Sequence, residues 1–522
     1  MADRCSTTPA TDWLAHHARV APDRIALTDA ATGDDVSYGA WNDRVNRTAR
    51  LLARRGVTRG DRVAVLARRR VDALDVWLAC GKMGAVAQML NVRLTASELA
   101  EQLAPSPKLL VHGDEEPAWA SLDAPRVTLA ELRSARASEP PSFESAAVGP
   151  DDPWVICYTG GSTGAPRGAV LTHGSIQANA VATVDGWGIR ADDSTVLTAP
   201  LFHVGGLLVL TAPLLLVGGR SIVCDRFDAG EVIDLIAGAR VTTFFGVPTM
   251  HASLCRHSRF ATSDLSSLRF VVSGGAPCPE SVVDAMRARG VPFREGYGLT
   301  EAGPNNFFVP DSELDALRCR VGYPLPGVEA RIVGPGDAPL APGVPGELCL
   351  RGAHLFAGYL AARIDNVHDG WLRTGDLAVV DARGAFSIVG RLKDVIFCGG
   401  ENVYPAEVEG VLAAHSEVAE VCVIPLRDAR LGEVGRAVVV PQPSAETFPT
   451  AELLAFARMR LARFKVPRDI VVAEALPRTS TGKVDRRAVL AAFGTESRLL
   501  PESQNHGAAH EHEPFPLPND AV

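Results

Sequence analysis

The chain carries one loop whose residue types suit phosphate binding. Between the strand-like runs WVICYT and GAVLTH lies a segment rich in Gly, Ser and Thr, residues 158–175, with the sequence YTGGSTGAPRGAVLTHGS. Such a loop can turn backbone N–H groups and hydroxyls toward phosphate oxygens, because glycine allows the required φ values and removes side-chain bulk. It is not a Walker A loop, since no G-K-[ST] sequence closes it. A flexible hairpin without a ligand is the alternative interpretation.

Lysine is rare in this chain, which makes each lysine informative. Of the 52 basic residues only five are lysine, at positions 82, 108, 393, 465 and 483, and the other 47 are arginine. This bias indicates a background in which lysine has been replaced by arginine wherever the chemistry allows it. Lys483, in the turn STGK, can supply a compact cation on a flexible stem. A solvated loop lysine is the alternative.

Composition excludes several classes of protein. The 522 residues are 47% hydrophobic with a net charge of -9, which gives no broad basic surface for nucleic acid or for an anionic membrane. No stretch approaches the roughly 20 apolar residues of a membrane span, and the start MADRCSTTPATDW resembles no targeting segment. The ten cysteines form no C-x-x-C pair, which indicates reduced thiols. We therefore expect a cytoplasmic protein.

Strand-like and helical patterns alternate along most of the chain. The run RVAVLA (62–67) predicts a buried strand and residues 71–84 predict the helix that follows it; residues 266–290 predict a second strand, a Gly-rich loop and a helix. This alternation predicts an α/β fold of layered sheets, in which ligands bind beyond the carboxyl ends of the strands.

The pattern changes near residue 390. We expect a large N-terminal domain over residues 1–391, a smaller α+β domain over 392–498 and a disordered tail over 499–522. The histidines of the tail, at 506, 510 and 512, have no preorganised site and do not predict a metal centre.

A series of motifs resembles the ANL superfamily, which comprises acyl- and aryl-CoA synthetases, adenylation domains of peptide synthetases, and luciferases. After the phosphate loop, further motifs follow in that family's order, and the resemblance covers about residues 12 to 490. The further motifs are SGGAP (273–277), GYGLTEAG (296–303), GELCLRG (346–352), FAGYL (356–360), WLRTGDL (371–377), GRLKDVIFCGGENVYPAEVE (390–409) and PRTSTGKVDRR (477–487).

The resemblance implies ATP, AMP, CoA and Mg²⁺ as ligands, and it implies a role for each matching residue. Catalytic roles fall on Lys483, His203, Thr163 and Glu301, with Glu301 as the metal ligand. Contacts to the nucleotide fall on Thr159, Gly160, Ser162, Thr163, Gly164, Arg167, Gly275, Ala276, Pro277, Gly296, Tyr297, Gly298, Thr300, Asp376 and Arg391, and contacts to CoA fall on Gly399, Gly400 and Glu401.

The chemistry is consistent with these residue types. Activating a carboxylate with ATP brings the charges of the carboxylate and the α-phosphate together, so the site needs a mobile cation and a metal. Asp376 in RTGD can accept hydrogen bonds from paired ribose hydroxyls, although an Asx turn is the alternative. By resemblance the small domain rotates about Lys393 between half-reactions, so that Lys483 leaves and the turn at 399–402 enters. A plain β-turn is the alternative for the two glycines of that turn.

The region expected to hold the acid points to an apolar substrate. APLFHVGGL (199–207) places His203 where CoA ligases of the family often carry histidine, and it offers no aspartate to pair with an amino acid's ammonium group. A structural histidine is the alternative. The strand VTTFFGVPTM ends at the expected pocket. The predicted lining is His203, Phe245, Gly246, Val247, Gly274 and Gly298.

The phosphate loop departs from the usual family form at two positions. Gly160 stands where a hydroxyl residue is common, and Arg167 stands where lysine is typical. Arg167 keeps the charge but replaces a point donor with a planar fork. Substitution without consequence is one interpretation; a weakened adenylation half-reaction with intact thioester formation is the other.

The sequence thus predicts an ATP- and Mg²⁺-dependent acyl-CoA ligase that acts on a small-molecule carboxylic acid. Two related enzymes are alternatives: a ligase that only makes thioesters from an acyl-adenylate supplied by a partner adenylating enzyme, and an adenylation enzyme that loads a carrier protein. A catalytically silent binding protein is disfavoured, because it has no need of Lys483, Glu301 and Asp376 together. A homodimer is an open possibility.

Overall fold

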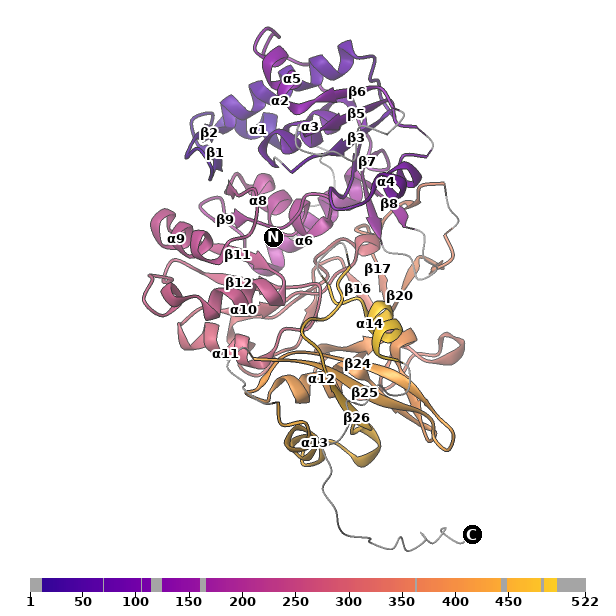
Figure 1. Ribbon diagram of the computed structural model, residues 1–522. Helices are drawn as coiled ribbons and strands as arrows, with labels where there is room; N and C mark the ends of the chain where they lie inside the picture. Colours follow the sequence, from indigo (N-terminus) through magenta and orange to yellow (C-terminus); the bar gives the residue numbers. More distant parts are fainter. Residues whose placement is uncertain are drawn as a thin grey trace, which may run out of the picture.

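The chain folds into layered α/β sheets, as the sequence predicts. The computed structural model of the protein describes residues 12–68, 70–104, 106–113, 124–159, 166–361, 364–442, 448–479 and 483–494. Two seven-stranded sheets lie in the N-terminal part, followed along the chain by a five-stranded sheet and, at the other end of the molecule, by the C-terminal sheet (Figure 1). The α/β class is therefore confirmed.

The first large sheet contains the predicted strand at 62–67 and is parallel except at one edge. Its apolar strand RVAVL is buried between neighbours on both sides and leads into the predicted helix α3. The antiparallel edge carries the phosphate loop, which joins β7 to β8. In sheet order the strands are β18 (Gly358–Tyr359), β8 (Arg167–Thr172), β7 (Pro153–Thr159), β4 (Val86–Met89), β3 (Arg62–Leu66), β5 (Leu109–His112) and β6 (Arg126–Thr128).

The second large sheet places three strand ends side by side. β13, β12 and β11 run parallel, so the loops that follow Gly246, Ser273 and Glu295 emerge at one edge of the sheet. In sheet order the strands are β13 (Phe293–Glu295), β12 (Phe270–Ser273), β11 (Thr243–Gly246), β9 (Ser194–Leu197), β10 (Arg220–Val223), β1 (Ile25–Asp29) and β2 (Asp35–Ser37).

Helices cover these two sheets, and their buried apolar side chains fall into two large hydrophobic clusters and a small one. Several of the helices begin with capping side chains; Thr95 and Glu98, for example, form a capping box at the start of α4. The helices are α1 (Trp13–Val20), α2 (Tyr38–Arg54), α3 (Arg70–Met83), α4 (Ala96–Gln102), α5 (Leu129–Arg136), α6 (His173–Trp187), α7 (Val204–Leu207), α8 (Thr211–Val217), α9 (Ala229–Ala239), α10 (Pro248–Arg256) and α11 (Glu280–Ala288). No helix in the described ranges combines the length and apolar character that a membrane crossing needs.

The third sheet is antiparallel and brings two predicted site residues together. Asp376 and Arg391 are register partners on neighbouring strands, so their side chains are adjacent. The strands are β16 (Glu329–Val333), β17 (Gly346–Arg351), β19 (Val367–His368), β20 (Trp371–Val380) and β21 (Phe386–Arg391), and a separate pair is formed by β14 (Phe307–Phe308) and β15 (Tyr323–Pro324).

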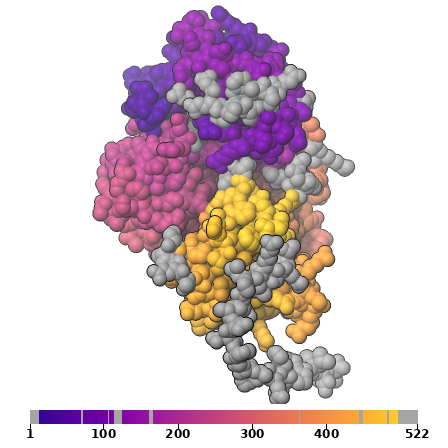
Figure 2. Space-filling model, viewed as in Figure 1, coloured from indigo at the N-terminus to yellow at the C-terminus, as the bar shows by residue number. Residues whose placement is uncertain are grey.

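The C-terminal residues form a compact α+β unit with core clusters of their own. Figure 2 shows its last segment, in yellow, lying against the N-terminal part. The domain boundary near residue 391 stays a prediction, and the predicted tail at 499–522 lies outside the described residues. The elements are β22 (Ile396–Cys398), β23 (Glu401–Val403), α12 (Pro405–Ala413), β24 (Val418–Asp428), β25 (Gly432–Pro441), α13 (Thr450–Arg458), β26 (Asp469–Val472) and α14 (Arg486–Phe493).

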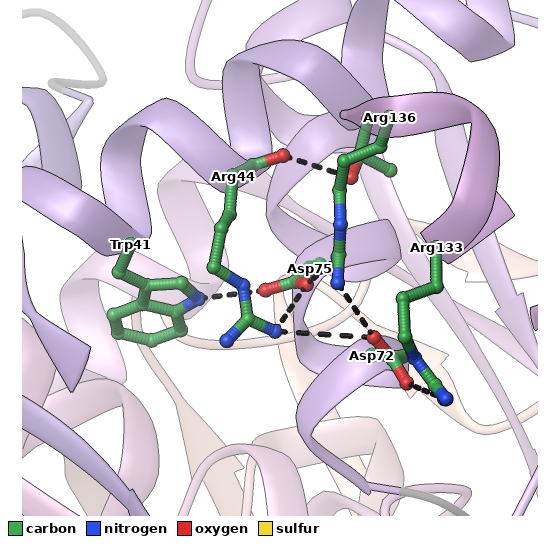
Figure 3. A network of polar contacts seen from close by, with 7 residues as sticks. Trp41, Arg44, Asp72, Asp75, Arg133 and Arg136 are labelled. Atoms are coloured by element: carbon green, nitrogen blue, oxygen red, sulfur yellow. Dashed lines mark hydrogen bonds and ion pairs between the residues drawn. The ribbon is translucent and has the colours of Figure 1, made fainter. Parts of the chain in front are cut away.

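A network of ion pairs joins three helices of the N-terminal part. Figure 3 shows side chains of α2, α3 and α5 pointing toward one another around two carboxylates of α3. Asp75 accepts hydrogen bonds from Trp41 Nε1 at 2.9 Å, Arg44 Nη2 at 2.7 Å and Arg136 Nη1 at 2.5 Å. Asp72 binds Arg136 at 3.2 Å and also pairs with Arg133. The two carboxylates therefore fix how the three helices pack.

We expect Asp75→Asn to destabilise the protein by about 3 to 5 kcal/mol, because removing one partner of a buried ion pair leaves uncompensated charge. The Asp75 side chain is only 1% exposed, so water cannot replace the lost interaction. Urea unfolding followed by circular dichroism measures the change. The exposed Asp192 provides the control, since Asp192→Asn should alter stability by less than about 0.5 kcal/mol. Equal unfolding midpoints for the two variants would contradict the assignment.

Candidate active site

Lys483 of the C-terminal unit reaches the edge where the strands of the second sheet end. A Cβ atom placed on Gly275, in the loop after β12, would lie 3.3 Å from Lys483 Cε. Part of Lys483 is exposed to solvent, but many protein atoms surround its ammonium group. The resulting loss of solvation is the main cause that lowers the pKa of this group. Arg391 lowers that pKa further, whereas Asp376 opposes the shift. Three motifs far apart in the sequence therefore meet around Lys483.

Asp376 lies at the centre of a hydrogen-bonded cluster beside this lysine. Arg391 Nε lies 2.9 Å from its Oδ1, and the Tyr297 hydroxyl donates to its Oδ2 at 2.7 Å. Burial raises the pKa of the Asp376 carboxyl, while Arg391, Tyr297 and Lys483 all oppose the rise. An ionised carboxylate has about four acceptor sites, so two contacts leave room for further donors such as hydroxyls.

The segment at 296–303 packs so tightly that its glycines cannot be replaced. A Cβ on Gly298 would lie 2.0 Å from the carbonyl oxygen of Pro304, and one on Gly296 would lie 2.9 Å from Val272. The segment continues into a 3₁₀ turn, Thr300–Ala302, that presents Glu301. The absence of side chains at the two glycines thus holds Tyr297 and Thr300 close to the ends of β12 and β13.

Two of the predicted phosphate-loop residues are described, and they sit at the base of the loop. Thr159 and Arg167 are register partners in β7 and β8. The Arg167 Nε atom is buried and has no hydrogen-bond partner among the described residues, which fits a cation placed for an anionic ligand. The predicted loop residues Gly160, Ser162, Thr163 and Gly164 lie outside the described residues.

Glu301 is the described carboxylate best placed to hold a metal near this loop. It is 8% exposed, and its Oε1 atom accepts a hydrogen bond from the Tyr359 hydroxyl at 2.8 Å. Within the described residues no group of three or more His, Cys, Asp or Glu side chains gathers at one point. A single carboxylate fits Mg²⁺, which usually keeps several waters and binds substrate phosphates alongside one or two protein ligands.

The loop after β12 presents an exposed, apolar surface where the resemblance places adenine. Gly275, Ala276 and Pro277 are all exposed. Behind them, Glu295 accepts a hydrogen bond from the backbone N–H of Cys278 at 3.1 Å and so anchors the loop to the end of β13. Burial raises the pKa of Glu295 to about 8. The sequence analysis missed this residue, because an acid at a strand end gives no signal of burial.

The predicted acyl-binding residues also lie near Lys483. His203 is the N-cap residue of α7, and its Nε2 atom is buried without a partner among the described residues. Burial, with smaller contributions from Lys483 and Arg93, lowers the pKa of His203 to about 4, so the imidazole is neutral at physiological pH. The sequence analysis did not anticipate Arg93 in this neighbourhood, since it follows β4 and belongs to none of the quoted motifs.

Phe245 forms the aromatic wall of this region. Its ring atoms would lie 3.2 Å from a Cβ on Gly205 and 3.2 Å from one on Gly274, so the ring packs between two backbone segments. Phe245 and Val247 are half-buried, and Gly246 is buried. Van der Waals contact between Val247 and the position of Gly275 completes the link to Lys483. The predicted lining residues Phe245, Val247 and Gly274 therefore lie together.

The predicted hinge and the predicted CoA turn are both exposed to solvent. Lys393 is exposed in the 3₁₀ turn Leu392–Asp394. Gly399 and Gly400 have φ values of 60° and 90° and form the two-residue turn of the β22–β23 hairpin, with Glu401 exposed beside them. The turn thus presents its two glycines to solvent.

The fold brings Lys483, Asp376 and Arg391 together beside the strand ends of the second sheet. The family model "AMP-binding enzyme" matches residues 14–360, and "AMP-binding enzyme C-terminal domain" matches residues 407–483. The chain belongs to the AMP-binding enzyme family. Its class within that family is the AMP-forming acid–thiol ligases, which activate an acid as an adenylate and then form the CoA thioester.

Individual relatives agree with this class. The chain is 39% identical to a feruloyl-CoA synthase of an Amycolatopsis species, over 92% of this chain and 98% of that protein. It is 35% identical to an indoleacetate–CoA ligase of Aromatoleum aromaticum, over 91% and 96% respectively. Among solved structures, it resembles ATP-bound MatB from Rhodopseudomonas palustris with a TM-score of 0.84 and 31% identity, over 93% of this chain and 99% of that one. The predicted family and enzyme class are thus confirmed.

The lowered pKa of Lys483 predicts the alkaline limit of adenylation. A cation whose pKa is depressed loses its charge at a lower pH than the ordinary lysine value of about 10.4, so kcat/KM for ATP should begin to fall below that pH. His203 is already neutral above about pH 5 and should add no further step near neutrality. A pH profile of pyrophosphate exchange measures this. An alkaline limb that persists unchanged in Lys483→Arg, whose charge is permanent, would contradict the assignment.

Proposed function

We propose that this protein converts an aryl carboxylic acid into its CoA thioester, using ATP and Mg²⁺ and passing through an acyl-adenylate. The observation that carries the proposal is the meeting of Lys483 with Asp376 and His203 at the carboxyl edge of the second sheet. That meeting puts a cation between the region predicted for the acid and the region predicted for the nucleotide. The arrangement suits the first half-reaction, in which both substrates are anions.

Each described residue then has a role that follows from its position. Asp376 accepts hydrogen bonds from the ribose hydroxyls, and Arg391 and Tyr297 hold its carboxylate in place. Lys483 draws the acid's carboxylate and the α-phosphate together. The acid's oxygen attacks the α-phosphorus as the bond to pyrophosphate breaks, giving acyl-adenylate and pyrophosphate. Glu301 would hold Mg²⁺, which neutralises phosphate charge when it is bound.

Thioester formation needs a second arrangement of the C-terminal unit. In that step the CoA sulfur attacks the acyl carbonyl, its proton is lost, and AMP leaves. We propose that rotation about Lys393 removes Lys483 and brings the exposed turn of Gly399, Gly400 and Glu401 to the site. Because both glycines lack side chains, the turn allows a pantetheine arm to pass close to the backbone.

The proposal of an aryl acid depends on Phe245. Its ring is fixed between Gly205 and Gly274, so one flat face is presented by a side chain that cannot easily move away. Flat aromatic surfaces pair well with other rings, with a gain of about 0.5 to 1.5 kcal/mol beyond simple burial. Feruloyl-CoA synthase and indoleacetate–CoA ligase, the two relatives described above, are named for aryl acids. An apolar acid without a ring is the alternative substrate.

We expect the purified protein to form acyl-CoA faster from phenylpropenoic or arylacetic acids than from linear fatty acids of equal carbon number. AMP release and thioester absorbance measure the rates. Phe245→Ala should lower kcat/KM for the aryl acids by about ten- to a hundredfold and for the linear acids by less. A preference for linear acids that Phe245→Ala leaves unchanged would contradict the aryl assignment but not the ligase chemistry.

The acceptor of the acyl group is the second point that this assay decides. Basic side chains occur from the end of α13 to the start of β26, at Arg458, Arg460, Arg463, Lys465 and Arg468. They suit the phosphates of CoA, and they also suit an acidic carrier protein, the alternative that the sequence left open. Thioester formation with free CoA at saturable, micromolar to millimolar concentrations supports the CoA ligase. Transfer only to a phosphopantetheinyl carrier protein would support the alternative.

A further inference from the structure

Tyr359 connects two groups that the proposed function uses separately. Its hydroxyl donates to Glu301 Oε1 at 2.8 Å, and the guanidinium carbon of Arg167 lies 4.1 Å from the centre of its ring. Tyr359 belongs to the short strand β18, which pairs with β8, and it lies opposite Ala169 on that strand. The FAGYL motif drew attention to this segment, but the sequence assigned Tyr359 no role.

The surroundings hold the tyrosine in one orientation. It is 6% exposed, and its ring packs edge-on against the ring of Phe356, with the two ring centres 4.9 Å apart. In this geometry the phenol hydroxyl donates to Glu301 Oε1. One Glu301 oxygen is therefore oriented, and the carboxylate retains lone pairs for another ligand.

Arg167 is suited to this ring in a way that lysine is not. A planar guanidinium can lie flat on an aromatic face while its N–H groups point outward, whereas an ammonium is a compact point charge. Besides the stack, Arg167 pairs with Asp365 at 3.3 Å, but that carboxylate is 70% exposed and the pair is weak. The ring therefore contributes most to holding the arginine beside the base of the phosphate loop.

We propose that Tyr359 is a positioning residue for adenylation, which orients Glu301 for Mg²⁺ and Arg167 for the outer phosphates of ATP. The inference rests on the proposed function of the site. It gives a reason for the unusual arginine at position 167: its stack on Tyr359 places the charge next to the metal-binding carboxylate. The replacement of lysine is then an adaptation of the phosphate site and does not weaken it.

The test compares Tyr359→Phe, which removes only the hydroxyl, with Tyr323→Phe. Tyr323 makes the matching bond to Glu313 at 2.9 Å, away from the site. Removing a partner that orients a metal ligand typically costs about ten- to a hundredfold in metal affinity. We expect Tyr359→Phe to weaken Mg²⁺·ATP binding by that factor in calorimetry, with ATP binding in EDTA nearly unchanged. High Mg²⁺ should restore adenylation, and Tyr323→Phe should behave like the wild type.

Two further variants separate the parts of the proposal. Tyr359→Leu removes the contact with the Arg167 guanidinium as well as the hydroxyl, and it should weaken ATP binding even in EDTA. Arg167→Lys should also weaken ATP binding in EDTA, but it should leave the Mg²⁺ dependence of binding unchanged. Unchanged Mg²⁺·ATP binding in Tyr359→Phe would overturn the inference, as would an equal loss with and without Mg²⁺. If the wild type binds Mg²⁺·ATP but makes no acyl-CoA from any acid, the proposed function fails while these binding results still decide the role of Tyr359.

Discussion

Replacing Lys483 with alanine should abolish most adenylation and leave thioester formation almost intact. In the structure its ammonium group lies beside Asp376, Arg391 and the loop at Gly275, where it can offset the charge that gathers when a carboxylate meets the α-phosphate. Loss of one preorganised electrostatic contact of this kind typically costs about 10²- to 10³-fold in rate. We expect a loss of that size in pyrophosphate exchange. Conversion of a preformed acyl-adenylate to acyl-CoA should fall by less than about threefold.

The control for this prediction is Lys108→Ala, which removes an exposed lysine outside the site. Both half-reactions should be unchanged in that variant. Equal losses in the two half-reactions of Lys483→Ala, together with a lower unfolding temperature, would mean that Lys483 acts through stability. Equal losses at unchanged stability would mean that the lysine serves both steps, which contradicts the proposed rotation of the C-terminal unit.

The second large effect is expected for Asp376→Asn. The change removes the charge that pairs with Arg391 and receives the Tyr297 hydroxyl, and it removes one acceptor proposed for the ribose. Hydrogen bonds to charged groups contribute about 1.5 to 3 kcal/mol, so KM for ATP should rise about ten- to a hundredfold. For the wild type, kcat/KM should be much lower with 2′,3′-dideoxy-ATP than with ATP. This difference between the two nucleotides, the dideoxy penalty, should be smaller in the variant.

A matched control exists in the C-terminal sheet. Asp469 receives two hydrogen bonds from Arg436, at 2.8 and 2.6 Å, and lies in β26, away from the nucleotide region. Asp469→Asn therefore breaks a similar pair without touching the site, and it should leave KM for ATP unchanged. A dideoxy penalty that stays the same in Asp376→Asn would show that this carboxylate does not contact the ribose.

Most of the fold could be predicted because hydrophobic patterns report burial directly. RVAVLA forms β3, residues 71–84 fall almost entirely within α3, and residues 266–290 give β12, a loop and α11, as expected. Pro279 is the N-cap of α11, which begins at Glu280. Apolar periodicity is a local property of the sequence, so it can be recognised without knowledge of the tertiary structure.

The site was predictable as a set of motifs but not as a set of contacts. Asp376 and Arg391 are fifteen positions apart, and only the register of β20 and β21 makes them neighbours. No role could be assigned to Glu295 or Tyr359 from the sequence, although Tyr359 lies in the FAGYL motif, because their contacts depend on burial and on partners from other segments. The ion-pair network of Asp72 and Asp75 could not be predicted for the same reason, because a charged residue on a helix normally indicates a solvated face.

The most direct test of the account is a paired assay on the purified protein with Mg²⁺ and CoA. One arm supplies ATP and a free aryl acid, and the other supplies the preformed aryl-adenylate. We predict acyl-CoA in both arms, at rates in the first arm that depend on Lys483. Acyl-CoA from the adenylate alone would contradict the account, because it would mean that the phosphate site with Arg167 does not support adenylation and that another enzyme supplies the intermediate.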